Sequence, residues 1–122
     1  MAPFVLYFSR MLDRVSQQLE KYMDLVAARQ KLVTANIANI DTPGYRTKDI
    51  QFQQEFQSLA EGETPRVVDV PNLKVKNDGN DVSLDREARM LSENNLRFTL
   101  AENILHDRIK EIRSAIQSGG QS

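Results

Sequence analysis

The sequence predicts a mainly α-helical protein in which long N- and C-terminal helices form a coiled-coil-like pair, with a small irregular or β middle segment between them. Residues 5–40 and 84–118 contain neither Gly nor Pro, and each stretch carries apolar residues at seven-residue spacing. That spacing places the apolar side chains along one line of each helix, as in coiled coils. Three of the five Gly and three of the four Pro lie within residues 41–83 instead. We therefore expect an N-terminal helix in 1–40, a middle segment in 41–83 and a C-terminal helix in 84–122.

The N-terminal helix carries the longer of the two apolar lines. Its members are Val5, Leu12, Leu19, Val26, Val33 and Ile40. The sequence Asp41-Thr42-Pro43-Gly44 should end this helix, because Pro43 disfavours helical backbone angles at Thr42 and Gly44 readily takes the positive φ of a turn.

The C-terminal helix repeats the pattern, with an apolar line at Leu84, Leu91, Phe98, Leu105 and Ile112. Either Ser83 or Asp81 is suited to cap its first turn, because both side chains can accept a hydrogen bond from a free backbone N–H group. Gly119-Gly120 follow the last apolar residue, and we expect the helix to end there.

The middle segment should hold short elements. Ile50, Phe52, Phe56 and Leu59 fit one stripe of a short helix. Residues 66–70 and 73–76 are rich in Val and alternate with charged residues, so they are expected to form a β-hairpin around Pro71-Asn72. Residues 77–80, with the sequence Asn-Asp-Gly-Asn, should form a turn.

Two such helices leave apolar surface without a partner inside one chain. Each would be about 50 Å long at 1.5 Å per residue. A hairpin of the two buries one seam only, and the apolar side chains that flank the seam stay exposed, which usually marks a contact with another molecule. The alternative is an ordinary monomer in which the middle segment covers the apolar surface of the helical hairpin.

Composition excludes several classes of protein. The chain has 122 residues, enough for one domain, with 16 Lys+Arg against 17 Asp+Glu and no Cys. The absence of Cys excludes a disulfide framework and, with a single His, a Cys/His zinc site. The balanced charge argues against a nucleic-acid binder. No window has the roughly 18 apolar residues that a transmembrane helix needs.

Catalytic side chains are also scarce, and the sequence predicts no enzyme, no cofactor and no small-molecule substrate. His106 is the single imidazole, and no Ser or Thr has the spacing of a nucleophile beside it. Asp78, Asp81, Asp85 and Glu87 do not match the spacing of a calcium-binding loop, so turn and cap roles are expected for them.

The most informative stretch runs from Ala35 to Tyr45, at the end of the first helix. Asn36 and Asn39 are three residues apart and can lie on one helix face. An amide within an apolar seam costs stability but can set helix register and the arrangement of subunits. The alternative is a frayed, polar helix end.

This stretch, A-N-x-A-N-x-x-T-P-G-Y, resembles the N-terminal signature of bacterial flagellar axial proteins of the rod and hook class. Residues 79–87 (GNDVSLDRE) are similar to a second block that opens the C-terminal helix in rod proteins. Residues 94–98 (NNLRF) resemble the stretch that follows it. The resemblance covers roughly residues 12–56 and 79–120.

The resemblance implies a non-enzymatic subunit that assembles helically into a proximal rod in the periplasm. The implied partners are further copies of the chain, the basal-body protein FliE and the export gate on the MS-ring side, and FlgC with other rod proteins. The implied assembly interface comprises Leu12, Leu19, Val26, Val33, Asn36, Asn39, Ile40, Leu84, Leu91, Phe98, Leu105 and Ile112. The signature turn is Thr42, Pro43, Gly44 and Tyr45.

Residues 3–8 are apolar, but they do not fit a cleaved signal peptide. No basic residue precedes them, and Arg10 follows where a small-residue cleavage site would lie. The resemblance implies another route, the flagellar type III export apparatus, without a cleaved signal peptide. Phe4, Phe8 and Leu12 match its short export motif, a Phe followed four residues later by an apolar residue.

Two other functions fit the same helices. One is a cytosolic coiled-coil adaptor or regulatory protein that binds one partner helix, although such a protein has no need for the signature turn. The other is a different rod-family subunit, such as FlgC.

Overall fold

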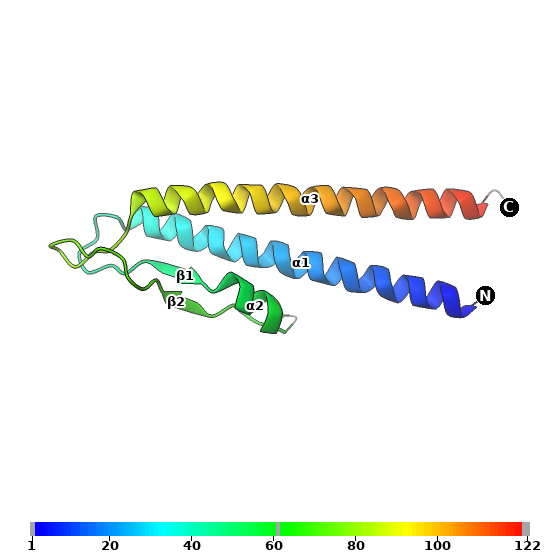
Figure 1. Ribbon diagram of the computed structural model, residues 1–122, viewed down its shortest axis with the longest axis horizontal. Helices are drawn as coiled ribbons and strands as arrows, with labels where there is room; N and C mark the ends of the chain where they lie inside the picture. Colours follow the sequence, from blue (N-terminus) through cyan, green and yellow to red (C-terminus); the bar gives the residue numbers. More distant parts are fainter. Residues whose placement is uncertain (1, 61, 121–122) are drawn as a thin grey trace.

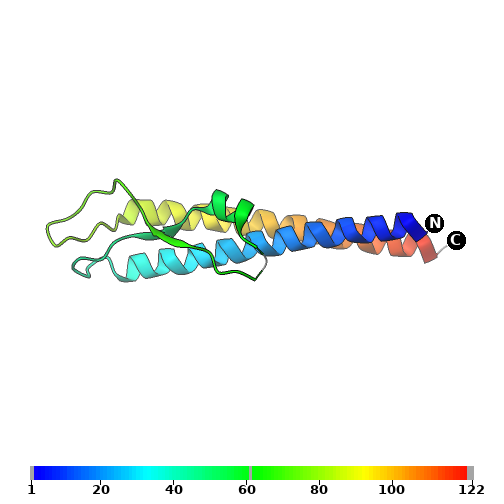
Figure 2. The same cartoon turned by 90° about the horizontal axis from the view of Figure 1, so that it is seen from below.

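The computed structural model describes residues 2–60 and 62–120. Its elements in chain order are α1 (Ala2–Ala38), β1 (Lys48–Ile50), α2 (Phe52–Ser58), β2 (Val67–Asp69) and α3 (Leu84–Gly120). The two long helices lie side by side, and both ends of the chain lie at the same end of the molecule (Figure 1, Figure 2). The prediction of a mainly α fold with a long helix pair and a small middle segment is confirmed.

Helix α1 is the central element, because α3, β1 and α2 all pack against it. In Figure 1 it lies between α3 and the middle segment. The apolar core sits where α1 meets that segment and contains Leu25, Val26, Ile50 and Phe52. Tyr22 meets the Phe52 ring edge to face, with ring centroids 5.3 Å apart. The core therefore lies near the middle of α1 rather than along its whole length.

The signals at the two ends of the connection act largely as expected. Helix α1 ends at Ala38, and Gly44 takes a φ of +75° in the turn that follows. Ser83 caps α3, because its Oγ accepts a hydrogen bond from the Arg86 N–H at 3.3 Å. Helix α3 ends at Gly120, within the Gly119-Gly120 pair where the sequence predicts its end.

The expected β-hairpin is also wrong. Strand β2 pairs antiparallel with β1, with Val68 opposite Asp49. Residues 73–76 form no strand. Asn72 takes a φ of +65°, which ends the extended backbone there. The Lys76 N–H then bonds to the Asn80 C=O at 2.8 Å. The distant partner β1 is available because α1 holds it beside β2, which no local pattern reveals.

Helix α3 turns a different line towards α1 than its apolar spacing suggests. Its side chains buried against α1 are Glu87, Asn94 and Ala101. Leu84, Leu91 and Phe98 are exposed, at 57%, 36% and 40%. We call these three residues the outer line. Neither long helix of the described chain is apolar enough over a sufficient length to span a lipid bilayer.

Candidate functional site

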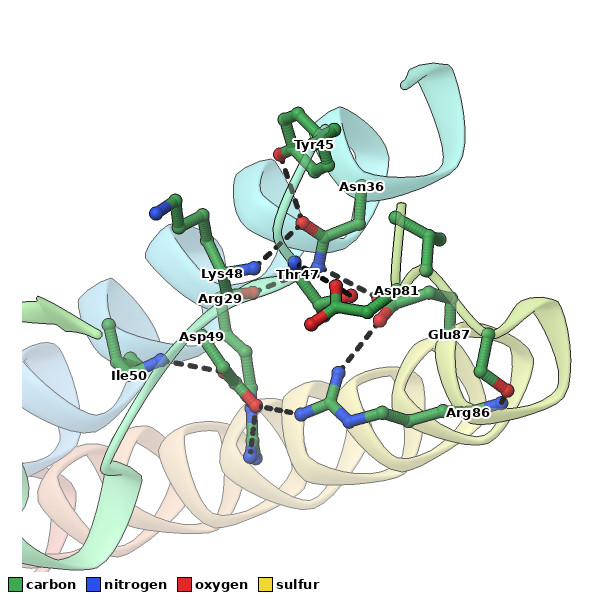
Figure 3. Close-up of polar contacts among 12 residues, drawn as sticks. Arg29, Asn36, Tyr45, Thr47, Lys48, Asp49, Ile50, Asp81, Arg86 and Glu87 are labelled. Atoms are coloured by element: carbon green, nitrogen blue, oxygen red, sulfur yellow. Dashed lines mark hydrogen bonds and ion pairs between the residues drawn. The ribbon is translucent and has the colours of Figure 1, made fainter. Parts of the chain in front are cut away.

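A buried polar network joins the end of α1, the turn after it, β1 and the start of α3 (Figure 3). We call it the polar junction. Its side chains come from both of the sequence blocks that carry the family resemblance, which lie about 40 residues apart in the chain. The members are Arg29, Asn36, Tyr45, Thr47, Asp49, Asn80, Asp81, Arg86 and Glu87.

Asn36 is fully buried at the centre of the polar junction. Its Nδ2 donates to the Lys48 C=O at 2.9 Å and to Glu87 Oε2 at 3.1 Å. Its Oδ1 accepts from the Lys48 N–H at 3.0 Å and from the Tyr45 hydroxyl at 3.1 Å. A single amide thus joins three segments, α1, the entry to β1 and α3. Such an amide sets register strongly, because any shift would leave buried polar groups unpaired.

Asp49 is the charged centre of the same network. Its carboxylate accepts two hydrogen bonds from Arg29, at 2.9 and 3.1 Å, and one from Arg86 at 2.6 Å. Burial alone would raise the pKa of Asp49, but the hydrogen bonds and charge of Arg29, with the Ile50 N–H and Arg86, hold it below its ordinary value. Arg86 also bonds to the fully buried Glu87 at 2.7 Å. The alternating charges of these residues link α1, β1 and α3.

The second block of the resemblance closes the turn. Asn80 donates from Nδ2 to the carbonyl oxygens of Asn39 and Thr42, each at 2.9 Å, and so satisfies the end of α1. Asp81 Oδ1 accepts from the Thr47 N–H at 2.6 Å and from its hydroxyl at 2.9 Å. Burial would raise the pKa of Asp81, but these bonds and Arg46 lower it below its ordinary value.

The structure brings only part of the predicted assembly interface together inside the chain. Val26, Val33 and Asn36 are buried, and Leu12, Leu19, Asn39, Ile40, Leu105 and Ile112 are half-buried. The outer line faces solvent. In the signature turn, Thr42, Pro43 and Gly44 are exposed and Tyr45 is half-buried. Burial of Tyr45 raises the pKa of its hydroxyl.

The candidate export residues lie on the first turns of α1. The rings of Phe4 and Phe8 are stacked with centroids 6.3 Å apart, and both side chains are exposed, at 72% and 37%. Leu12 is half-buried one turn further on.

Sequence reasoning did not find the partners of Asn36. The sequence predicts a turn or cap role for Glu87, which is instead buried against Asn36, and it indicates no role for Arg29 or Asp49. The available signal was local: Asp49 and Glu87 lie within or directly after the two resemblance blocks. The polar side chains of the junction bond to one another and to backbone, so their geometry serves to hold α1, β1 and α3 together.

Known proteins match the chain over these same segments. A family model described as flagella basal body rod protein matches residues 23–46, which include Asn36 and the signature turn. The flagellar basal body rod protein FlgB of Escherichia coli strain K12 is 31% identical over 141 residues, covering 89% of this chain and 99% of the relative. FlgB of Borrelia hermsii is 27% identical, with 80% and 91% covered, and FlgB of Bacillus subtilis strain 168 is 26% identical, with 84% and 93% covered. The chain therefore belongs to the family of the flagellar basal body rod protein FlgB.

Proposed function

We propose that this chain builds the proximal rod by helical polymerisation through its two long helices, without catalytic activity. Membership of the FlgB family makes it a structural subunit of the flagellar basal-body rod. The polar junction would hold the two helices in fixed register within each subunit. The apolar side chains outside that junction would then pack against neighbouring subunits.

The observation that carries this proposal is apolar exposure on both long helices. Within the described chain, large apolar side chains stand open on the first turns of α1 and along α3: Phe4, Leu6, Tyr7, Phe8, Met11, Leu84, Leu91, Leu96, Phe98, Leu100, Ile104, Ile109 and Ile116. Removing such surface from water contributes about 25 cal/mol per Å², against which the entropy lost on association is set. A monomer gains nothing from leaving it in water.

We further propose the neighbours and the location. Other copies of the chain would surround each subunit, FliE and the export gate would lie on the MS-ring side, and FlgC with other rod proteins would follow. The rod would stand in the periplasm, and the chain would leave the cytoplasm through the flagellar type III apparatus without a cleaved signal peptide. The exposed Phe4 and Phe8 support this route, because an export receptor can reach them before assembly.

A complementation experiment tests the rod proposal. The chain, carrying a small tag in the exposed loop at Thr64, is expressed in a flagellated bacterium that lacks its own FlgB, and basal bodies are isolated for electron microscopy. We expect restored swimming and tag density at the base of the rod, beside the MS ring. Recovery of the chain in the cytosol of swimming-deficient cells, bound to one soluble partner, would instead support the adaptor function.

A paired substitution tests the export proposal. Replacing Phe4 and Phe8 with Ala should abolish secretion, because the candidate motif is removed. The matched control replaces Leu6 and Tyr7 with Ala, which removes similar exposed apolar surface from the same turns. Secretion is measured by immunoblotting of culture medium and cell fractions from a strain that cannot complete its rod. Equal secretion of both variants would show that the Phe residues are not a signal.

A further inference from the structure

The first turns of α1 expose apolar side chains on every side of the helix. Phe4, Leu6 and Tyr7 are 72%, 60% and 71% exposed. A helix turns by about 100° per residue, so these three side chains point in different directions around its axis. A groove on a protein partner covers one face of a helix, whereas a helix that is apolar all round needs an apolar medium on each side. The pattern therefore suits a lipid layer better than a protein groove.

Basic charge gathers at the same end of the molecule. Residues 2–14 of α1 and residues 108–120 of α3 lie at the end where both chain ends are found (Figure 1, Figure 2). We call these two stretches the terminal region. It contains five basic and two acidic residues, whereas the rest of the chain contains 11 basic and 15 acidic residues. The nearly neutral chain is therefore polarised along its long axis, with its positive end beside the apolar turns.

Most cations of the terminal region have no counter-charge in the chain. Four of the five basic side chains are exposed, and in the described part of the chain none of these four has an ion-pair partner: Arg10, Arg14, Lys110 and Arg113. The fifth, Arg108, pairs with Glu111 at 3.1 Å. Arg10 and Arg14 follow the apolar turns directly and, being four residues apart, share one helix face. An anionic surface would neutralise all four free cations together.

We propose that the terminal region binds the surface of an anionic lipid bilayer. The first turns of α1 enter the boundary between headgroups and acyl chains, and the basic side chains lie at the phosphate groups. Residues 3–8 rise about 9 Å along the helix, and interfacial segments reach about 5–10 Å into this boundary. The stems of Arg10 and Arg14 extend along the apolar layer while their guanidinium groups stay at the headgroups. This contact goes beyond the proposed rod function, because the free chain carries it and no second copy takes part.

Two contributions add in this contact. Burial of the apolar turns supplies one, and attraction between the basic side chains and anionic headgroups supplies the other. A short apolar segment alone gives weak, reversible binding, and a second signal is needed for a stable contact. We therefore expect binding that depends on both the apolar turns and the anionic lipid, and that weakens as salt screens the charges.

Vesicle flotation tests the proposal with the purified chain alone, so the result does not depend on rod assembly. Vesicles rise through a sucrose gradient, whereas free or self-associated protein stays at the bottom. We expect the chain to float with vesicles of phosphatidylglycerol and phosphatidylcholine at about 0.1 M salt, and to stay behind at about 1 M salt, where the Debye length falls to about 3 Å. It should also stay behind with vesicles of phosphatidylcholine alone. No flotation with the anionic vesicles, or equal flotation with both kinds, would overturn the proposal.

A pair of substitutions tests the apolar turns. Leu6→Ser with Tyr7→Ser should abolish flotation. The matched control is Leu84→Ser with Leu96→Ser, since these side chains are similarly exposed, at 57% and 71%, but lie outside the terminal region. The control should float like the parent chain, and circular dichroism and thermal unfolding should show that both double variants stay folded. Equal loss of flotation in the two pairs would mean general adsorption of apolar side chains and would contradict the assigned site.

A second pair tests the charges at matched net charge. Arg10→Gln with Arg14→Gln should weaken binding to the anionic vesicles about 25-fold, since each basic side chain near such a surface contributes a factor of about five. Lys31→Gln with Lys74→Gln removes two exposed cations elsewhere in the chain and should change binding little. If both pairs weaken binding equally, overall charge rather than the terminal region attracts the chain, and the proposal fails.

A fluorescent probe reports which part of the chain enters the lipid. The chain has no natural Trp, so Tyr7→Trp places a single indole on the first turns of α1. Its emission should shift to shorter wavelength when the anionic vesicles are added, because the indole leaves water. Leu96→Trp, at an exposed position of α3 outside the terminal region, is the control and should show no shift. Equal shifts in the two variants would place the side of α3 on the lipid instead and overturn the assigned contact.

Discussion

Single residues of the polar junction hold the chain together where apolar packing is absent. Asn36 makes four hydrogen bonds, which reach the turn, β1 and α3. The Asp49 carboxylate accepts hydrogen bonds from both Arg29 and Arg86. Buried polar groups of this kind contribute modestly when satisfied and cost far more when one partner is lost. The junction therefore specifies one arrangement of α1 against α3 more than it adds to overall stability.

Replacing Asn36 with Leu should lower the free energy of unfolding by about 2–4 kcal/mol. Leu leaves the Lys48 N–H, the Lys48 C=O and the Glu87 carboxylate without this partner, and each buried group that stays unpaired costs about 1–3 kcal/mol. Helicity at low temperature should persist. Urea unfolding followed by circular dichroism measures the change. Asn95→Leu, at an exposed position of α3, is the matched control and should change stability by less than about 0.5 kcal/mol.

Acid should destabilise the fold through Asp49 and Asp81. The pKa of each carboxyl is below its ordinary value of 3.8 in the folded chain, so the unfolded chain takes up protons first as pH falls. The stabilisation is complete above pH 3.8 and is lost as the pH falls through the lower folded-state values. Asp49→Asn should be less stable than the parent at pH 7, and the difference should narrow below pH 4.

Urea unfolding from pH 3 to pH 7 measures this narrowing. Val33→Ala provides the control, because it lowers stability by opening space in the core and removes no titrating group. The free energy of unfolding of Val33→Ala, plotted against pH, should stay parallel to that of the parent chain. If the free energies of unfolding of Asp49→Asn and the parent differed by a constant amount from pH 3 to pH 7, the assigned role of Asp49 would be contradicted.

At the scale of elements, α3 has one face of polar and small residues buried against α1 and one line of large apolar residues that is exposed. The apolar spacing of its sequence correctly indicates a long helix with a heptad line, yet Leu84, Leu91 and Phe98 flank the buried face instead of forming its centre, and they stay partly exposed. Glu87 and Asn94 turn inwards because α1 offers Asn36 and Gln30 as partners, the latter at 3.1 Å from Asn94 Nδ2. Ala101 permits close approach of the two helices. The rotation of α3 is thus set by polar matching, and its apolar line is left outside.

Two substitutions on α3 should therefore change the stability of the monomer in the reverse of the order that side-chain hydrophobicity alone predicts. Ala101→Leu should destabilise the monomer by about 1–3 kcal/mol, since the added volume separates α3 from α1 at a position that is 1% exposed. Leu91→Ala removes more apolar surface from the chain but should cost less than Ala101→Leu, because Leu91 is already 36% exposed and its truncation opens no enclosed cavity. Thermal unfolding of the two variants gives the comparison. If Leu91→Ala lowered the unfolding temperature more than Ala101→Leu did, the outer line would be the face that packs against α1.

At the scale of the whole molecule, side-chain burial decreases from the polar junction to the termini. The polar junction and the apolar core occupy one half, where α1, α3 and the middle segment meet (Figure 1). In the other half, the first turns of α1 and the last turns of α3 have mostly exposed side chains. Few buried contacts hold these turns, so local opening there should require little free energy.

Amide hydrogen exchange should show this gradient. In the purified chain, amides in residues 25–38 and 87–101 should exchange slowest, and those in residues 3–11 and 109–119 should exchange with little protection. In isolated basal bodies, the two terminal stretches should become protected, because neighbouring subunits bury them. Uniform protection along both helices of the free chain would mean that the terminal turns are stable without assembly.

The sequence by itself determined the two long helices and the turn at Pro43-Gly44, because helix breakers, heptad spacing and turn residues act through local backbone preferences. It indicated the family through the resemblance of residues 35–45 and 79–98 to known rod proteins. It did not predict the pairing of β2 with β1, the rotation of α3 or the partners of Asn36. Those depend on which side chains meet across 20 to 50 residues of chain, where burial and hydrogen bonding outweigh local preference. The tertiary structure therefore decided which apolar side chains are buried within the chain and which stay exposed.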